Sequence, residues 1–246
     1  MERYSYSKLN GWHTCPKSWA MTYIDHKPGQ SNGFASFGTL CHSILEGYEN
    51  GEYELSSLAD IYEFSYADAV PEKFPPNKYV DLAESYYRQG LKFFQNWEGY
   101  PEGTEILGVE HKFEIPINND WLLNGFIDLE YRDAEGHTRI RDHKSKKGFT
   151  KKELAEYAKQ IYIYSTAFRE QFGEFPEFLE FFCFRENKVY EIPFDINDYN
   201  KAMDWAQRTV DEIRNAWCYD PNPSEFYCKY LCNHRDECQY GKLGGG

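Results

Sequence analysis

The segment 125–147, GFIDLEYRDAEGHTRIRDHKSKK, is the part of the chain around which the predicted fold is built. Its pattern predicts two β-strands joined by a tight turn, because residues suited to a half-buried strand run with a period of two through 126–131 and again through 138–142. Ala134, Glu135 and Gly136 lie between the two runs. Their number and the late glycine are typical of a three-residue hairpin loop.

This loop predicts a register for the hairpin. If Asp133 faces His137, counting outward one pair at a time places Asp128 opposite Asp142 on the same face, with the Cβ atoms about 5 Å apart. Like charges so close on a sheet are destabilising unless a cation lies between them, so the pair indicates a site for a hard divalent ion. Lys144 follows Asp142 by two residues and is therefore predicted on the same face.

The composition is that of a water-soluble protein built as one elaborated domain. The chain has 246 residues, of which 41% are hydrophobic and 27% are charged, so it can bury a substantial core. The sequence has no run of about 18 apolar residues that could form a transmembrane helix, and its N-terminus lacks the basic segment followed by an apolar one that an export signal needs. We therefore expect a cytoplasmic protein with no membrane contact.

The charge is strongly acidic but unevenly distributed. A formal net charge of -13 argues against general binding of nucleic acid, which depends on basic patches. Five lysines nevertheless fall within nine residues directly after the paired acids: Lys144, Lys146, Lys147, Lys151 and Lys152. The strip is compatible with DNA binding beside a metal site and equally with a solvated loop.

The rest of the chain predicts helices around a mixed sheet. Helices are expected over 4–25 (as two short ones), 34–48, 52–97 with a break at 74–76, and 150–172, and a further helix capped by Asn197 is expected to run to about Trp217. Further strands are expected over 105–117, 177–184 and 188–194. Thr150 and Glu153 have the spacing of a capping box. This order of elements predicts a mixed α/β fold with helices packed against the sheet.

Several polar side chains on these elements are candidates for the same site. His42 lies off the apolar stripe of its helix, one turn after Gly38, and is either a ligand or a polar surface residue. Glu110, midway along the strand 105–117, either adds a carboxylate or faces solvent. Gln160 and Tyr164 are four residues apart on one helix face, where they either contact a substrate or are simply solvated.

The seven cysteines fall into two groups. Cys41, Cys183 and Cys218 are expected in the core. Cys228, Cys232 and Cys238 lie within eleven residues of a proline-containing segment, which indicates metal binding in a cytoplasmic protein. With Cys15 as the fourth ligand they would hold an iron–sulfur cluster, whereas His234 or His13 would give a zinc site with three cysteines. Either N-terminal ligand would join the two ends of the chain.

Taken together, these features resemble the PD-(D/E)xK nuclease superfamily, and within it the RecB-like nucleases that carry an iron–sulfur cluster, a branch that includes CRISPR-associated and AddB-like recombination exonucleases. The resemblance covers most of the chain, and the motifs occur in the family's order. There are two departures: three residues rather than two separate Cys228 from Cys232, and Ser145 stands where threonine is usual. The matching features are the YSYSKLNGWHTCP segment with Cys15, His42, Asp128 in GFID, Asp142-His143-Lys144, Gln160 with Tyr164, and the terminal cysteines.

The resemblance implies a restriction-endonuclease-like αβββαβ core that hydrolyses DNA with Mg²⁺ or Mn²⁺. Carried over by position, Asp128, Asp142, the carbonyl of His143 and His42 would bind the metal ion. Lys144 would position or polarise the attacking water and stabilise charge on the phosphate. Gln160 and Tyr164 would orient the substrate strand or the water. The four cysteines would hold a [4Fe-4S] cluster, with structural Zn²⁺ as the alternative.

The expected organisation is one nuclease domain over 1–246. It would comprise a helical insertion at about 50–100, a sheet core at 104–194, cluster-binding ends at 15 and 228–238, and a flexible tail at 241–246. The function we expect is a DNA exonuclease acting on single strands or duplex ends in recombination, repair or phage DNA processing, in a bacterium, an archaeon or a phage. The alternatives are a non-catalytic DNA-binding or assembly subunit and an endonuclease on the same fold. A helicase or recombination protein is a plausible partner.

Overall fold

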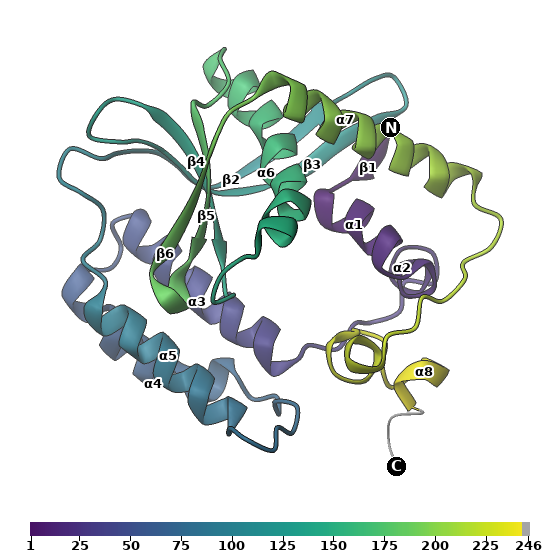
Figure 1. Cartoon of the computed structure of the whole chain (residues 1–246), viewed down its shortest axis with the longest axis horizontal. Coiled ribbons are helices and arrows are strands. Elements are labelled where there is room, and N and C mark those ends of the chain that lie inside the picture. Colours follow the sequence, from purple (N-terminus) through teal and green to yellow (C-terminus); the bar gives the residue numbers. More distant parts are fainter. Residues whose placement is uncertain (243–246) are drawn as a thin grey trace.

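In the computed structural model, which describes residues 1–242, six strands form one mixed β-sheet (Figure 1). The order is β1-β3-β4-β5-β6, and β2 pairs with the other edge of β3 in an antiparallel ladder. β1 joins β3 and β4 joins β5 in parallel, whereas β3–β4 and β5–β6 are antiparallel. The strands are β1 (Glu2–Tyr4), β2 (Glu105–Pro116), β3 (Trp121–Arg132), β4 (Thr138–Lys144), β5 (Phe178–Cys183) and β6 (Lys188–Pro193).

Helices cover both faces of this sheet. They are α1 (Tyr6–Thr14), α2 (Pro16–Tyr23), α3 (Gly33–Glu49), α4 (Leu58–Ala69), α5 (Leu82–Asn96), α6 (Lys151–Phe172), α7 (Ile196–Asn215) and α8 (Gln239–Lys242), with short helical turns η1 (Leu55–Ser57), η2 (Phe184–Glu186) and η3 (Tyr227–Leu231). Within residues 1–242, none of the helices is long and apolar enough to cross a membrane. The segment 241–246 was predicted to be a flexible tail. Its first two residues, Gly241 and Lys242, belong to α8, and residues 243–246 lie outside the described part of the chain.

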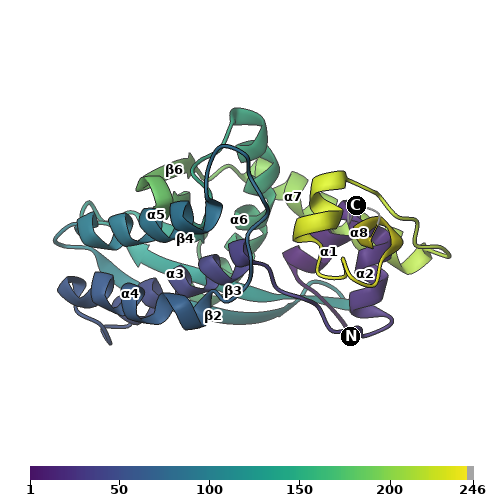
Figure 2. The same cartoon turned by 90° about the horizontal axis from the view of Figure 1, so that it is seen from below.

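Two neighbouring residues of β5 show how the layers are arranged. Phe181 is buried in the core that β3 and β4 share with α6, α7 and α1, whereas Phe182 is buried in the core formed by α3, α4 and α5. Successive side chains of a strand point to opposite faces, so the sheet separates two hydrophobic cores. Figure 2 shows α3, α4 and α5 at one end of the molecule and α1, α2, η3 and α8 at the other. The mixed α/β fold predicted from the sequence is confirmed.

The helix starts follow local capping chemistry. The side chain of Ser5 accepts a hydrogen bond from the N–H of Lys8, and Pro16 occupies the first position of α2. Thr150 and Glu153 form the predicted capping box of α6. One cap was predicted wrongly: Asp195, not Asn197, caps α7, because its carboxylate accepts from the N–H groups two and three residues ahead. The sequence pattern also missed β1, which is three residues long.

The central hairpin has the predicted register. The N–H of Asp133 bonds to the carbonyl of His137 at 3.0 Å, and Gly136 takes the left-handed conformation with φ 92°. The ladder ends at the pair Leu129–Arg141, and β4 then continues along β5 instead. Asp128 and Asp142 are the next residues of the two strands, so both acids lie where the strands separate.

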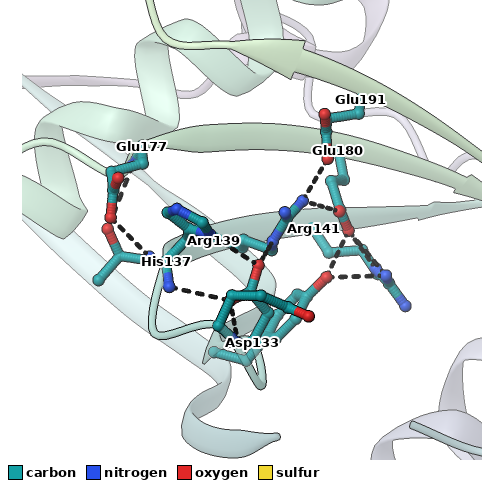
Figure 3. Close-up of polar contacts among 10 residues, drawn as sticks. Asp133, His137, Arg139, Arg141, Glu177, Glu180 and Glu191 are labelled. Carbon is teal, nitrogen blue, oxygen red and sulfur yellow. Dashed lines mark hydrogen bonds and ion pairs between the residues drawn. The ribbon is translucent and has the colours of Figure 1, made fainter. Parts of the chain in front are cut away.

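A network of ion pairs, buried at Arg141 and Glu180 and exposed at Glu191, holds the hairpin to the rest of the sheet (Figure 3). Arg139 bridges Asp133 at 2.6 Å, Glu180 at 2.7 Å and Glu191 at 2.5 Å. Arg141 donates to the same Glu180 carboxylate at 2.8 Å. Because these residues come from the hairpin, β5 and β6, the network fixes β4 from the face opposite Asp142. Breaking such a buried pair by removing one partner is strongly destabilising.

Candidate active site and cysteine cavity

Asp128 is held in place by the strand that carries Asp142. Its Oδ2 accepts a hydrogen bond of 2.6 Å from the backbone N–H of His143. Burial is the main cause that raises the pKa of Asp128, and together with the nearby charge of Asp142 it brings this pKa to about 8. Two carboxylates that repel each other in a dry site favour either a shared proton or a bound cation.

Asp142 is the centre of a polar cluster with a lysine and a glutamine. The Nζ of Lys144 lies 2.6 Å from Asp142 Oδ2 and donates to Gln160 Oε1 at 2.9 Å. The amide of Gln160 in turn donates to Asp142 Oδ1 at 2.7 Å and to the hydroxyl of Tyr164 at 3.3 Å. The structure thus brings together four of the residues that the sequence nominated, from β4 and the helix that follows it.

Asp128 also belongs to a second group, with His42 and Glu110. One ligand atom from each of these three residues lies within 4.8 Å of the other two. The group draws on α3, β2 and β3. Glu110 occupies the level of Asp128 in the β2–β3 ladder, between the pairs Val109–Leu129 and His111–Ile127. Sequence reasoning left its role open between ligand and solvent-facing residue.

The backbone of Glu110 is strained, since its φ is 46° in the middle of a strand. Such a conformation costs a residue with a side chain about 1–3 kcal/mol and is concentrated at functional sites. The sequence did not predict this conformation, because glutamate has no preference for positive φ angles. Glu110 lies directly beside Asp128 in the sheet, so the strained residue belongs to the same site.

These three side chains suit a divalent metal ion. Burial lowers the pKa of His42 to about 3, which keeps its imidazole neutral and able to ligate. Burial raises the pKa of Glu110, and the neighbouring Glu46 adds to the effect, so nearby cationic charge would stabilise its ionised form. One nitrogen and two carboxylates fit Mn²⁺ or Mg²⁺. A hollow of about 440 Å³ is lined by His42 and Glu110 together with Gly38 and Ser145.

The side chain of His143 does not line this hollow and forms a contact that the sequence did not reveal. Its Nε2 lies 3.0 Å from Glu49 Oε1, and both side chains are almost completely buried. Burial alone would lower the pKa of His143, but the carboxylate of Glu49 outweighs it and raises the pKa. Glu49 also accepts a bond from the hydroxyl of Tyr100. His42 and Glu49 are seven residues apart on α3, a spacing that could have suggested a common face.

The four cysteines nominated as ligands line one cavity at the other end of the molecule: Cys15, Cys228, Cys232 and Cys238. Both views place α2 beside η3 (Figures 1 and 2), and the side chains of Ser18 and Cys232 are in contact. The segment that carries Cys15 and the segment 228–238 therefore meet here, and ligation of one metal group by both stays a prediction. Cys41 and Cys183 are buried in the core, but Cys218 is only half-buried and contacts Asp220, so its predicted core position is wrong.

Two of the four sulfurs accept hydrogen bonds from the backbone. Backbone N–H groups of Ser224 and His234 point at Cys228 and Cys232, both at 3.4 Å, as suits thiolates.

The two histidines considered as zinc ligands differ in position. His13 does not line the cavity; its Nε2 bonds to Thr209 at 2.8 Å. His234 does line it, and its Nε2 bonds to Thr22 at 2.8 Å while its buried Nδ1 has no partner among the described residues. The four-cysteine arrangement therefore fits the cavity better than one that uses His13.

The chain is similar to known proteins over most of its length. The chain is 26% identical over 259 residues to the Gene 69 protein of Mycobacterium phage D29, covering 92% of this chain and 93% of that protein. The crystal structure of SSO0001 aligns with a TM-score of 0.41 and 15% identity over 98% of this chain and 88% of the other. The model of the PD-(D/E)XK nuclease superfamily matches residues 3–239. The chain therefore belongs to the PD-(D/E)XK nuclease superfamily.

Proposed function

We propose that this protein is a divalent-metal-dependent deoxyribonuclease that acts as an exonuclease on single strands or DNA ends. The observation that carries the proposal is the position of Lys144. Its ammonium lies 2.6 Å from Asp142, between the acid and Gln160, beside the His42, Glu110 and Asp128 group. A fixed cation next to a metal site is the arrangement that hydrolysis of a phosphodiester needs.

In this proposal the chain's own residues divide the work. His42, Glu110 and Asp128 would hold the metal ion, with Asp142 and the carbonyl of His143 as further ligands. When bound, a divalent ion neutralises phosphate charge and lowers the pKa of a coordinated water. Lys144 would place its charge against the phosphate oxygen on which negative charge develops. Gln160 keeps the lysine and Asp142 in a fixed relation, and Tyr164 supports Gln160 from the next turn of α6.

We propose further that the cysteine cavity holds a [4Fe-4S] cluster, which would place the chain in the RecB-like branch. The four cysteines that line one cavity and the N–H groups directed at Cys228 and Cys232 support four-thiolate ligation. The cluster would be structural. It would tie η3 to α2. Helix α2 packs against α1, α1 packs against α7, and α7 lies beside α6, the helix that carries Gln160 and Tyr164.

A panel of labelled substrates tests the proposed activity. Wild-type protein is incubated with Mn²⁺ or Mg²⁺ and linear single strands, linear duplex, circular single strands and circular duplex. We expect digestion of linear molecules and none of circles, with Asp142→Ala inactive as the control for contaminating nucleases. Cutting of circles would identify an endonuclease instead. No cleavage of any substrate by folded protein would point to a non-catalytic subunit that binds DNA or a helicase or recombination partner.

A further inference from the structure

A groove of about 590 Å³ runs between α6 and α7, next to the proposed catalytic site. Figure 1 shows the two helices side by side. Its basic lining residues are Lys151 and Lys159 on α6 and Lys201 and Arg208 on α7, and Asp198 is its one acidic lining residue. The mechanism proposed above uses none of these side chains.

The groove is basic in a protein that is acidic overall. Two of its cations are already paired, Lys159 with Glu156 at 2.6 Å and Lys201 with Asp198 at 2.7 Å. Lys151 and Arg208 are exposed, and within residues 1–242 no carboxylate oxygen lies within 4.0 Å of either charged group. In a chain with a net charge of -13, two cations without a carboxylate partner beside an open groove favour a polyanionic ligand.

An aromatic ring lies in the wall of the same groove. Trp205 is partly exposed, and Lys159 Nζ lies 5.2 Å from its ring centroid. The rings of His13 and Tyr6 support it from the protein side, with centroids at 5.4 Å and 5.8 Å. A tryptophan held by neighbouring rings offers a rigid surface on which an unpaired base can stack.

The groove and the catalytic residues lie on neighbouring faces of α6. Lys159 lines the groove, and the next residue, Gln160, is turned by about 100° around the helix and donates to Asp142 at 2.7 Å. Lys151 is eight residues before Lys159, so the basic edge extends about 12 Å along the helix from the level of Gln160. A strand whose phosphate reached Asp142 and Lys144 could therefore continue along this edge.

We propose that the groove between α6 and α7 binds a segment of single-stranded DNA contiguous with the cleaved bond. Lys151 and Arg208 contact its phosphates, and Trp205 stacks on a base. The proposal deepens the nuclease function and names its substrate as single-stranded, because stacking on a wall tryptophan requires a base that is not paired.

Binding is measured without cleavage, by fluorescence anisotropy of a labelled dT20 strand with the full-length protein in buffer free of divalent ions. The test variant is Lys151→Gln/Arg208→Gln. The matched control is Arg88→Gln/Lys92→Gln, which removes two exposed cations from α5. We expect the groove variant to bind at least fivefold more weakly than wild type. The slope of log Kd against log salt concentration should fall by about 1.4, since each of the two lost phosphate contacts on a single strand contributes about 0.7.

A second variant tests the stacking surface. Trp205→Ala should weaken binding at least fivefold with an unchanged salt slope, and Trp205→Phe should restore most of the affinity. The proposal is overturned if the groove variants bind dT20 like wild type, if the α5 control loses as much affinity, or if the variants lose equal affinity for a 20-base-pair duplex. Binding is measured apart from cleavage. A wild-type protein that cleaves no DNA would therefore refute the nuclease function without affecting the test of the DNA-binding groove.

Discussion

The carboxylate of Asp128 on β3 accepts a hydrogen bond of 2.6 Å from the backbone N–H of His143 on β4. Asp128 is one residue and His143 two residues beyond the last paired position of the hairpin, where β4 leaves β3 and continues along β5. The bond therefore fixes the first acid relative to the strand that carries Asp142 and Lys144. The position of the site follows from where the hairpin opens.

The metal-free protein should lose stability as the pH rises. The folded-state pKa of Asp128, about 8, is above its unfolded value of 3.8, so the protonated acid stabilises the fold below about pH 4 and this contribution is lost as the pH rises to about 8. In thermal unfolding without metal, we expect Tm to fall more steeply between pH 5 and pH 8 for wild type than for Asp128→Asn. Parallel curves for the two proteins would contradict the buried-acid assignment.

Adding metal should reverse that loss. At pH 8 a bound divalent ion stabilises the folded state by about 2.7 kcal/mol when its concentration is 100 times Kd. Mn²⁺ should therefore raise the Tm of wild type and have much less effect on Asp128→Asn, and the same titration serves as the control for the pH experiment.

Glu110→Gln should weaken metal binding. The substitution keeps the shape of the side chain but removes one of the two carboxylates that approach His42, so we expect at least a tenfold rise in the Kd for Mn²⁺, measured by isothermal titration. Glu114→Gln is the matched control, since Glu114 lies on the same strand and pairs at the surface with Arg3. A Kd that is unchanged by Glu110→Gln would remove this residue from the site.

Glu49→Gln tests whether the buried contact behind the site positions it. Glu49 and His42 both belong to α3, and Glu49 holds His143 at 3.0 Å, so loosening this contact should displace His42 relative to β4. We expect weaker binding of Mn²⁺ and a higher metal requirement for cleavage, with kcat at saturating metal less affected. Loss of stability with unchanged metal affinity would mean that Glu49 serves only the fold.

Much of this arrangement was predictable because it depends on local chemistry. A three-residue loop with glycine at its end determines the hairpin register, and Thr150 with Glu153 determines the start of α6. Glu110 and Glu49 could not be assigned in the same way. One depends on a strained backbone angle in mid-strand, and the other on a contact between residues 94 positions apart. Both features arise only when the sheet and α3 are packed together.

Cys15→Ser should abolish cluster binding. Wild-type protein purified without oxygen is expected to be brown, with broad visible absorbance and about four irons per chain, whereas the variant should be nearly colourless and less stable. Cys218→Ser is the control, because Cys218 lies outside the cavity and contacts Asp220. A colourless wild type that contains one zinc per chain would refute the cluster.

The most direct measurement is the single-turnover rate of cleavage of a labelled linear single strand by Lys144→Ala with saturating Mn²⁺. Wild type and the surface control Lys78→Ala should cleave at equal rates, and Lys144→Ala should be slower by at least a hundredfold, the loss typical of removing one charge-stabilising group. Its Kd for Mn²⁺ should remain measurable, which separates the role of the lysine from loss of the metal site. Equal rates for Lys144→Ala and wild type would contradict the catalytic site described here.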